Sequence, residues 1–376
     1  MVTDKKRKIC FISASWVRER EILAALNKHV DLLFVCPYQQ NNNYSIKDVS
    51  SFCEANNIKF IINDFTNCRA SNPARIVKDF KLVSKIKKFN PEITYIEAFG
   101  SPYFAIYSRV FLGSKNTIIA IMDYKLHQRS MGQFKISEKY YRFIQLKFYK
   151  NFQFFSYSQE KLFLKEHPSK TSFVIRLFLV GTNLPKEEQN SQNRKPNLLF
   201  FGRIFFYKGV DVLIKAANLL AKKRRDFKII IAGNCKNWNE EYQPLIENPD
   251  VFDLRIRYIS AEELADLYNK SDYLITPYRE VTQSGPLLRA YYYDLIPIAS
   301  DEDGFTEYID HGKNGFLFKN ESVEDLAKVL EKVLNLTNFE KHSILNQIEL
   351  FKTIEFDLDN VVKKYINMFD SIAKNN

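Results

Sequence analysis

Two cations stand in a segment whose pattern could place them against an anion. Residues 200–211 read Phe-Phe-Gly-Arg-Ile-Phe-Phe-Tyr-Lys-Gly-Val-Asp, so Gly202, Arg203 and Lys208 follow a short apolar run and precede an amphipathic one. In parallel α/β sheets, ligands bind at the carboxyl ends of the strands. An arginine fork and a lysine at such a place can neutralise a diphosphate. The segment therefore predicts an anion site, with an ordinary loop carrying surface cations as the alternative.

Two further loops could complete such a site. Gln283, Ser284 and Gly285 stand before Pro286, a residue type favoured in the first turn of a helix. The free N–H groups of a helix start attract phosphate, although a capped helix without a ligand is the alternative here. Residues 300–307 form an acidic loop, which could bind sugar or ribose hydroxyls or a metal, or could simply be solvated.

In the first half of the chain, Asp123 and His127 follow the apolar run 117–121. If that run is a strand, both side chains stand where its carboxyl end could face a cleft between domains. A histidine with a purely structural role is the alternative.

These loops need a sheet to hold them, and the apolar runs of the first half predict one. Short apolar runs that alternate with polar stretches of helical length are typical of parallel strands covered on both faces. The alternation predicts a doubly wound α/β domain. The expected strands are Lys8–Ser13, Val30–Val35, Ile58–Ile62, Ile93–Glu97, Thr117–Ile121 and Phe154–Tyr157.

A polar stretch bracketed by prolines, residues 183–196, marks a boundary, and beyond it the same pattern restarts. An amphipathic helix is expected over Val210–Ala221, and Ser260 with Glu263 predicts a capping box before a later helix. The length of 376 residues is that of two domains. The expected strands are Asn197–Phe201, Phe227–Ala232, Tyr273–Thr276 and Ile296–Ser300.

The net charge, the cysteines and the apolar runs limit which partners and which cellular location the sequence predicts. A net charge of +11 suits phosphorylated ligands, a membrane surface or nucleic acid, but no recognised nucleic-acid motif is present. The five cysteines are odd in number and lack CxxC spacing, which argues against disulfides or zinc and fits a reducing cytosol. No apolar run approaches the ~18 residues of a membrane span, and no signal peptide is expected.

Together these segments resemble the retaining glycosyltransferases of family 4 in the GT-B class, the glycosyl transferases group 1. The resemblance is strongest from Asn197 to about Leu336. It rests on the pieces FFGRIFFYKGVDVLIKAANLL, FKIIIAG and ELADLYNKSDYLITPYREVTQSGPLLRAYYYDLIPIASDEDGFTEYIDHGKNGFLF, in matching order and spacing. It implies an α/β protein of two Rossmann-like doubly wound domains facing a central cleft. The acceptor-side domain would span residues 1–183, with a helix at about 357–376 crossing back to it, and the nucleotide-sugar domain residues 184–356.

The resemblance also implies roles for single residues. Arg203 and Lys208, just after Gly202, match the pair that holds the donor diphosphate and stabilises the departing charge. Gln283, Ser284 and Gly285 match the loop and helix start that contact the phosphates or the sugar.

The remaining matches are less complete. Glu307 matches the acid of the family's Gly-Gly-x-x-Glu loop, with Asp303 in place of the first glycine. Met122 replaces the first histidine of a His-Asp, three residues, His pattern that Asp123 and His127 otherwise match, which would place His127 near the donor sugar and the acceptor.

The family signature also has two glutamates separated by seven residues, and this chain departs from it. The first position is Val281, with Glu280 one place early, and the second, which binds the donor ribose, is Arg289. A carboxylate accepts hydrogen bonds from ribose hydroxyls, whereas arginine can only donate.

The implied reaction moves a sugar from a UDP- or GDP-sugar to a hydroxyl of a glycan or lipid-linked acceptor, with retention and without a metal or other cofactor, as in bacterial surface polysaccharide synthesis. The expected location is cytoplasmic, and no nucleic-acid partner is expected. Two basic aromatic stretches, residues 75–88 and 135–150, could lie on an anionic membrane surface, or could be solvated helix faces. The main alternative function is a catalytically inactive glycosyltransferase-like partner subunit, which Val281 and Arg289 suggest.

Overall fold

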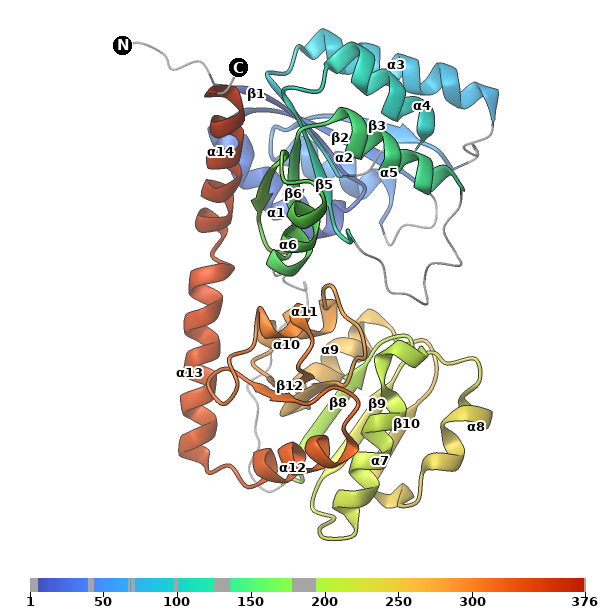
Figure 1. Ribbon diagram of the computed structural model, residues 1–376, viewed down its shortest axis with the longest axis vertical. Helices are drawn as coiled ribbons and strands as arrows, with labels where there is room; N and C mark the ends of the chain where they lie inside the picture. Colours follow the sequence, from blue (N-terminus) through green and yellow to red (C-terminus); the bar gives the residue numbers. More distant parts are fainter. Residues whose placement is uncertain are drawn as a thin grey trace. The chain divides into compact units, whose positions relative to one another are not determined.

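The computed structural model describes residues 6–39, 44–66, 68, 72–97, 101–124, 136–177 and 194–374. The chain divides into two compact units, one made of Met1–Phe178 with Glu355–Asn376 and the other of Leu179–Ile354 (Figure 1). Each unit is built around one parallel sheet. No helix among these residues has the length and apolar character needed to cross a bilayer.

The sheet of the first unit has seven parallel strands in the order β3-β2-β1-β4-β5-β6-β7. The expected strand Phe154–Tyr157 is displaced by three residues, because Ser156 caps the helix that begins at Tyr157. The edge strand β7, short and half-exposed, was not predicted. The strands are β1 Lys8–Ile12, β2 Asp31–Tyr38, β3 Lys59–Asp64, β4 Ile93–Ile96, β5 Thr117–Ile121, β6 Asn151–Phe154 and β7 Thr171–Val174.

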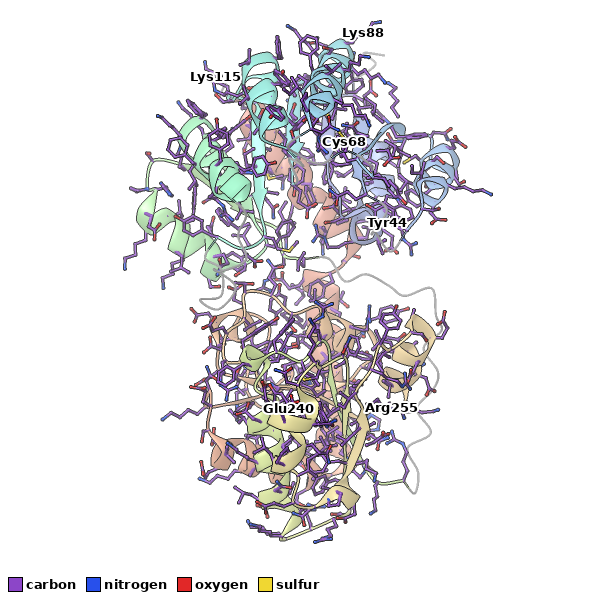
Figure 2. All side chains as sticks on the ribbon, turned by 90° about the vertical axis from the view of Figure 1, so that its right-hand side faces the viewer. Tyr44, Cys68, Lys88, Lys115, Glu240 and Arg255 are labelled. Atoms are coloured by element: carbon purple, nitrogen blue, oxygen red, sulfur yellow. The ribbon has the colours of Figure 1, made fainter. Side chains whose placement is uncertain are left out.

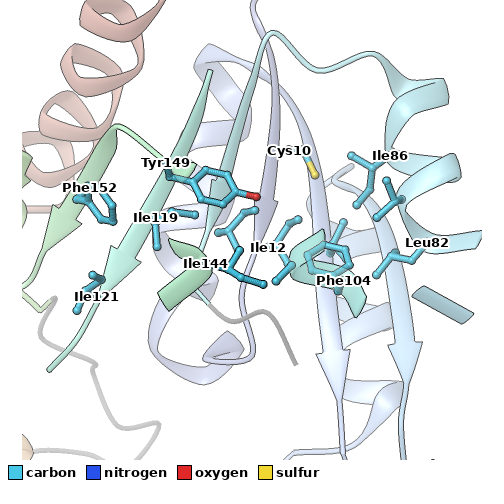
Figure 3. Packing of buried hydrophobic residues seen from close by; sticks show 14 of the residues in the cluster. Cys10, Ile12, Leu82, Ile86, Phe104, Ile119, Ile121, Ile144, Tyr149 and Phe152 are labelled. Atoms are coloured by element: carbon cyan, nitrogen blue, oxygen red, sulfur yellow. The ribbon is translucent and has the colours of Figure 1, made fainter. Parts of the chain in front are cut away.

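Helices cover both faces of this sheet because its strands are apolar on both sides. Residues of α3, α4, α5 and α6 pack on one face in a single cluster with Cys10, Ile12 and Ile119 (Figure 3). On the other face the ring of Tyr365 in α14 contacts those of Phe11 and Tyr95. The helices are α1 Trp16–His29, α2 Ile46–Ala55, α3 Pro73–Phe89, α4 Pro102–Tyr107, the π-helix η1 Ser108–Leu112, α5 Ile136–Phe148, α6 Tyr157–Glu166 and α14 Leu358–Lys374.

The sheet of the second unit has six parallel strands in the order β10-β9-β8-β11-β12-β13. The expected strands Asn197–Phe201, Tyr273–Thr276 and Ile296–Ser300 form as β8, β11 and β12, and β9 begins one residue late, at Lys228. The short outer strands β10 Phe252–Arg255 and β13 Phe316–Phe318 were not predicted. The helices are α7 Val210–Ala221, α8 Trp238–Glu241, α9 Ala261–Asn269, α10 Gly285–Tyr292, α11 Asp303–Thr306, α12 Val323–Leu334 and α13 Asn338–Glu355.

One local expectation is only half right. Ser260 caps α9 by accepting the Glu263 N–H at 3.2 Å. The Glu263 carboxylate, however, binds Arg255 and Arg257. Two arginine partners hold it away from the helix start, so it does not complete a capping box.

Each sheet reverses its strand order at one place. The chain leaves β1 toward β2 and β3 on one side, whereas β4 to β7 lie on the other, and β8 and β11 stand in the same relation in the second unit. The crevice at the carboxyl ends of such neighbouring strands is where open α/β sheets bind ligands. The two crevices lie at the carboxyl ends of β1 and β4 and of β8 and β11. They are called the β1/β4 edge and the β8/β11 edge below.

Candidate functional site

Two glycines at the β8/β11 edge approach each other closely. Gly202 follows β8 with φ +134° and its N–H donates to Ala232 at 3.0 Å. A Cβ on Gly233, which follows β9, would lie 2.1 Å from the Gly202 carbonyl oxygen. A Cβ on Gly202 itself would meet nothing within 4 Å. The backbone at Gly202 is thus exposed on the side where a ligand could approach it.

Lys208 lies in this crevice without a charged partner in the second unit, where residues 194–354 are all described. Its Nζ stands 3.7 Å from the ring centroid of Tyr278 and 5.3 Å from that of Tyr207. Burial lowers the pKa of Lys208 to about 7. An ammonium group held on aromatic faces can donate three hydrogen bonds to an incoming anion.

Arg203 stands nearer to solvent. Its side chain is exposed, and its guanidinium lies 5.7 Å from the ring centroid of Phe205. An exposed guanidinium and a half-buried lysine on the same loop give the edge two cations of different character. The arginine can reorient toward a ligand, whereas the lysine is held in place.

A half-buried ion pair fixes the loop that carries Lys208. Arg279 donates to both oxygens of Asp211, at 2.9 and 2.7 Å, and also pairs with Glu321. The Arg279 N–H donates to the Tyr207 carbonyl at 2.8 Å. Burial would raise the pKa of Asp211, but hydrogen bonds and charge from Arg279 hold it below its usual value. Sequence reasoning missed this pair because its members are 68 residues apart.

Replacing Arg279 by methionine is expected to destabilise the second unit by about 2 kcal/mol at pH 7, less than the ~3–5 kcal/mol of a fully buried pair. The loss of stability should shrink as the pH falls. In the variant, Asp211 is protonated at a higher pH than in the wild-type protein, and a protonated carboxyl group does not require a neighbouring cation. Denaturant unfolding at pH 7 and pH 4.5 measures both values. Arg225→Met is the control, since its pair with Asp250 is half-exposed and should contribute under about 1 kcal/mol. Equal losses for the two variants would contradict the prediction.

The second predicted loop starts a helix at the same edge. Ser284 is the N-cap of α10 and accepts the Leu287 N–H at 3.3 Å. Gly285 is exposed, and a Cβ there would meet nothing within 4 Å. Gln283 is half-buried. The helix start is therefore open to a ligand, with the orphan N–H groups that attract anions.

The acidic loop 301–307 packs on this second loop. A Cβ on Gly304 would lie 2.6 Å from the Val281 carbonyl oxygen, so only glycine allows the approach. Glu302 accepts a hydrogen bond from Asn320 at 2.6 Å, and its pKa is raised by burial and by nearby acids that include Glu280. Glu307 ends α11 and is half-buried.

Arg289 lies away from the helix start, on the side of α10 that faces α9. Its guanidinium stands 5.8 Å from the ring centroid of Tyr268, whose hydroxyl donates to the Pro286 carbonyl. The structure thus places Gly202, Arg203, Lys208, Ser284 and Gly285 on loops of one edge. Arg289 belongs to α10, and its aromatic contact is with Tyr268 of α9.

In the first unit, Asp123 follows β5, and its carbonyl accepts a hydrogen bond from Arg142 at 2.8 Å. It stands one strand away from the β1/β4 edge. His127 lies outside the described residues, so its predicted place is a hypothesis that the structure does not address.

The β1/β4 edge holds a charged cluster that the sequence did not reveal. Glu97, at the end of β4, accepts hydrogen bonds from Ser13, Ser15 and Arg18, and Arg18 also donates to Glu19. Glu19 is 1% exposed. Burial first, and then the Glu97 charge, raise the pKa of Glu19, whereas Arg18 and the hydrogen bonds lower that of Glu97 despite its burial. The two carboxyl groups thus share a single arginine, and Glu19 is the one that holds a proton more readily.

This assignment predicts opposite effects for two conservative changes. Glu19→Gln should leave thermal stability at pH 8 unchanged or raised, because glutamine resembles a protonated glutamic acid. The pKa of Glu19 is raised in the folded wild-type protein, so that protein loses stability as the pH rises above the ordinary pKa of the group, whereas the glutamine variant does not. Glu97→Gln should destabilise by about 3 kcal/mol, because Arg18 loses its buried counter-ion. Thermal unfolding at pH 5 and pH 8 tests both, and the advantage of Glu19→Gln should grow with pH. A Glu19→Gln protein as unstable as Glu97→Gln would reverse the assignment.

The chain is similar to known proteins in both sequence and fold. Residues 183–349 match the family model described as Glycosyl transferases group 1. An uncharacterized glycosyltransferase of Haemophilus influenzae is 28% identical over 170 residues, which are 44% of this chain and 47% of that protein. The match thus spans about half the length of that relative. An N,N'-diacetylbacillosaminyl-diphospho-undecaprenol alpha-1,3-N-acetylgalactosaminyltransferase of Campylobacter jejuni is 22% identical over 94% of this chain and 95% of its own.

Solved structures share the fold along nearly the whole chain. A glycosyltransferase from Rickettsia africae ESF-5 superposes with a TM-score of 0.71 and 19% identity, covering 99% of this chain and all of that one. Anabaena Alr3699/HepE in complex with UDP-glucose superposes with a TM-score of 0.67 and 15% identity, covering 97% and 99%. The chain has the GT-B fold, as predicted. The domain matched by residues 183–349 is of the kind predicted from the sequence.

Proposed function

We propose that this protein is a retaining glycosyltransferase of family 4, which transfers a sugar from a UDP- or GDP-sugar to a hydroxyl of a glycan or lipid-linked acceptor in bacterial surface polysaccharide synthesis. The observation that carries the proposal is the β8/β11 edge. A half-buried lysine that has no counter-ion among the described residues 194–354, an exposed arginine and an open helix start converge there. All three favour the same ligand, a diphosphate.

In the proposed reaction, the bond between the anomeric carbon and the diphosphate oxygen breaks, and the acceptor oxygen bonds to the same face of that carbon. The acceptor proton passes to the leaving diphosphate. Arg203, Lys208 and the backbone at Ser284–Gly285 stabilise the charge that develops on the departing oxygen. Because these groups supply the positive charge, transfer is expected without a metal or other cofactor, and activity should survive EDTA.

The remaining residues take supporting roles in the proposal. Gly202 leaves room for the nucleotide, Gln283 and Glu307 bind the donor, and Glu280 stands beside them. Asp123 and His127 serve the sugar and the acceptor. The name of the Campylobacter relative supports an acceptor carried on a lipid diphosphate. A cytoplasmic enzyme attached to the inner face of an anionic membrane would meet such an acceptor.

Arg289 favours one second candidate, a catalytically inactive glycosyltransferase-like partner subunit. The side chain at the ribose position is a cation beside Tyr268 instead of a carboxylate. An inactive subunit would keep the fold and lose the donor.

Thermal-shift measurements with UDP, GDP, ADP and CMP separate the two. An active enzyme should be stabilised by one diphosphate, and the shift should vanish in Arg203→Ala. A folded protein that none of the four stabilises would favour the inactive subunit, with Arg289 as the leading cause. Arg289→Glu would then be expected to restore a shift.

A further inference from the structure

Three helical elements of the first unit carry exposed apolar side chains on their outer side. α3, α4 with η1, and α5 lie next to one another on one face of the sheet (Figure 1). Their inner sides already belong to the core (Figure 3). Eight of the 18 large hydrophobic side chains that are exposed among the described residues nevertheless stand on them. These eight are Val77, Phe80, Ile106, Val110, Phe111, Tyr140, Phe143 and Phe148, here called the α3–α5 face.

Spacing along each helix and one ring contact bring these residues together. Val77 and Phe80 stand one turn apart on α3, as do Tyr140 and Phe143 on α5. The Phe80 ring contacts Phe111 edge-on, with ring centroids 5.7 Å apart, which joins α3 to η1. Val110, at the centre of η1, is 65% exposed. Apolar patches of this kind on a soluble surface mark interaction sites.

Cations accompany the apolar residues. Lys87 stands 5.6 Å from the ring centroid of Phe111, Arg109 5.9 Å from that of Phe148, and Lys147 5.3 Å from that of Phe143. Lys88 is also exposed, as is Lys115 just beyond η1, and Figure 2 labels both on the first unit. The described side chains of these elements include a single carboxylate, Asp79, which is fully buried. The described part of the face is therefore apolar, and its exposed charges are cationic.

The structure also corrects the basic stretches expected from the sequence. Arg75 is 1% exposed, pairs with Asp79 and stacks on Phe65, so it belongs to the interior. Tyr149 is fully buried as well. The exposed members of the two stretches, in contrast, gather on one side of the unit, which periodicity alone did not establish.

We propose that the α3–α5 face docks the protein on an anionic lipid bilayer, with Val110 and Phe143 at the level of the headgroups and the lysines on the lipid phosphates. Aromatic and aliphatic side chains interleaved with lysine and arginine fit that interface. A second copy of the chain is a poor occupant, because a two-fold contact would set cations against cations. Nucleic acid would match the charge but would leave Val110 and Ile106 without a partner. The inference rests on the proposed membrane association and not on the proposed sugar transfer.

Flotation of the full-length protein with vesicles tests the proposal. Binding is expected with phosphatidylcholine vesicles that contain about a third phosphatidylglycerol, is expected to be weak with pure phosphatidylcholine, and should fall with salt. The double variant Val110→Asp/Phe143→Asp should reduce the partition coefficient at least about tenfold, as should Lys87→Gln/Lys147→Gln on the anionic vesicles. The matched control is Phe339→Asp/Lys236→Gln, which changes an exposed ring and an exposed lysine of the second unit. It should bind as the wild-type protein does.

Each other outcome overturns the inference. Absence of binding to anionic vesicles, or an equal loss in the control, removes the α3–α5 face as a lipid-binding surface. A wild-type dimer in light scattering that Val110→Asp/Phe143→Asp dissociates would assign the face to a second copy. Binding that only the lysine variant weakens would indicate a polyanion surface without insertion. The thermal shift with nucleotide should be the same in all variants, so failure here is distinct from failure of the proposed activity.

Discussion

Replacing Lys208 by methionine is expected to weaken binding of the nucleoside diphosphate about 10–100-fold and to slow sugar transfer about 100–1,000-fold, while making the unliganded protein more stable. The binding loss follows from the removal of a charge-assisted contact. The larger rate loss follows because the charge on the leaving group grows in the transition state. The gain in stability follows because methionine keeps the apolar stem on Tyr278 without burying an amine.

The effect on stability depends on pH with a defined sign. Burial holds the pKa of folded Lys208 at about 7, against an ordinary value of 10.5. Between these values the unfolded chain binds the proton and the folded protein does not, so the wild-type protein gains stability as the pH rises from 7 toward 10.5. The advantage of Lys208→Met, about 2–5 °C in the unfolding temperature, should therefore be largest at or below pH 7 and vanish near pH 10.

The same group gives donor binding a pH dependence. A bound diphosphate restores the charge on Lys208, so above pH 7 binding takes up a proton and the affinity of the wild-type protein should fall with rising pH. Titration calorimetry with UDP and GDP at pH 6.5 and pH 8.5 measures this change, which Lys208→Met should lack. Lys215→Met, on the exposed side of α7, is the control and should behave as the wild-type protein does. Undiminished nucleotide affinity in Lys208→Met would show that the diphosphate lies elsewhere.

Replacing Gly209 by alanine is expected to destabilise the second unit by more than about 3 kcal/mol and to abolish donor binding. A Cβ at this position would lie 1.8 Å from the Pro277 carbonyl oxygen, and the residue has φ +64°. The clash is with backbone, so either the loop after β8 or the loop after β11 must move. Since Lys208 precedes Gly209 and rests on Tyr278, either movement separates the lysine from its aromatic support.

Gly312→Ala is the matched control for this change. Gly312 has φ +80°, but a Cβ there would meet nothing within 4 Å. It should therefore show the backbone strain alone, about 1 kcal/mol, with unchanged donor binding. Denaturant unfolding and nucleotide thermal shifts compare the two variants. Equal destabilisation by Gly209→Ala and Gly312→Ala would mean that the close approach of Gly209 to Pro277 is not the reason why glycine is required at position 209.

Much of the second unit was predictable because its signals are local. Buried strands such as Ile296–Ser300 are short apolar runs, and α7 has an apolar stripe that any helix of that sequence would bury. Ser284 predicts the start of α10, because its capping hydrogen bond forms within four residues. Once β8 and α7 were predicted, Gly202, Arg203 and Lys208 could be placed in the loop between them. The edge strands β10 and β13 escaped prediction because they are short and owe their form to a single neighbour.

The amino-acid sequence by itself determined that this chain is an α/β protein with two cations and a helix start after strands of its second half. Only the tertiary structure decided that Lys208 lies half-buried against Tyr278, that Asp211 pairs with Arg279, and that Glu19 and Glu97 share an arginine. The reason is that a side chain's charge state and partner depend on which distant segments pack around it. Strand pairing and burial bring those segments together, whereas sequence spacing reaches only across one helix or one turn.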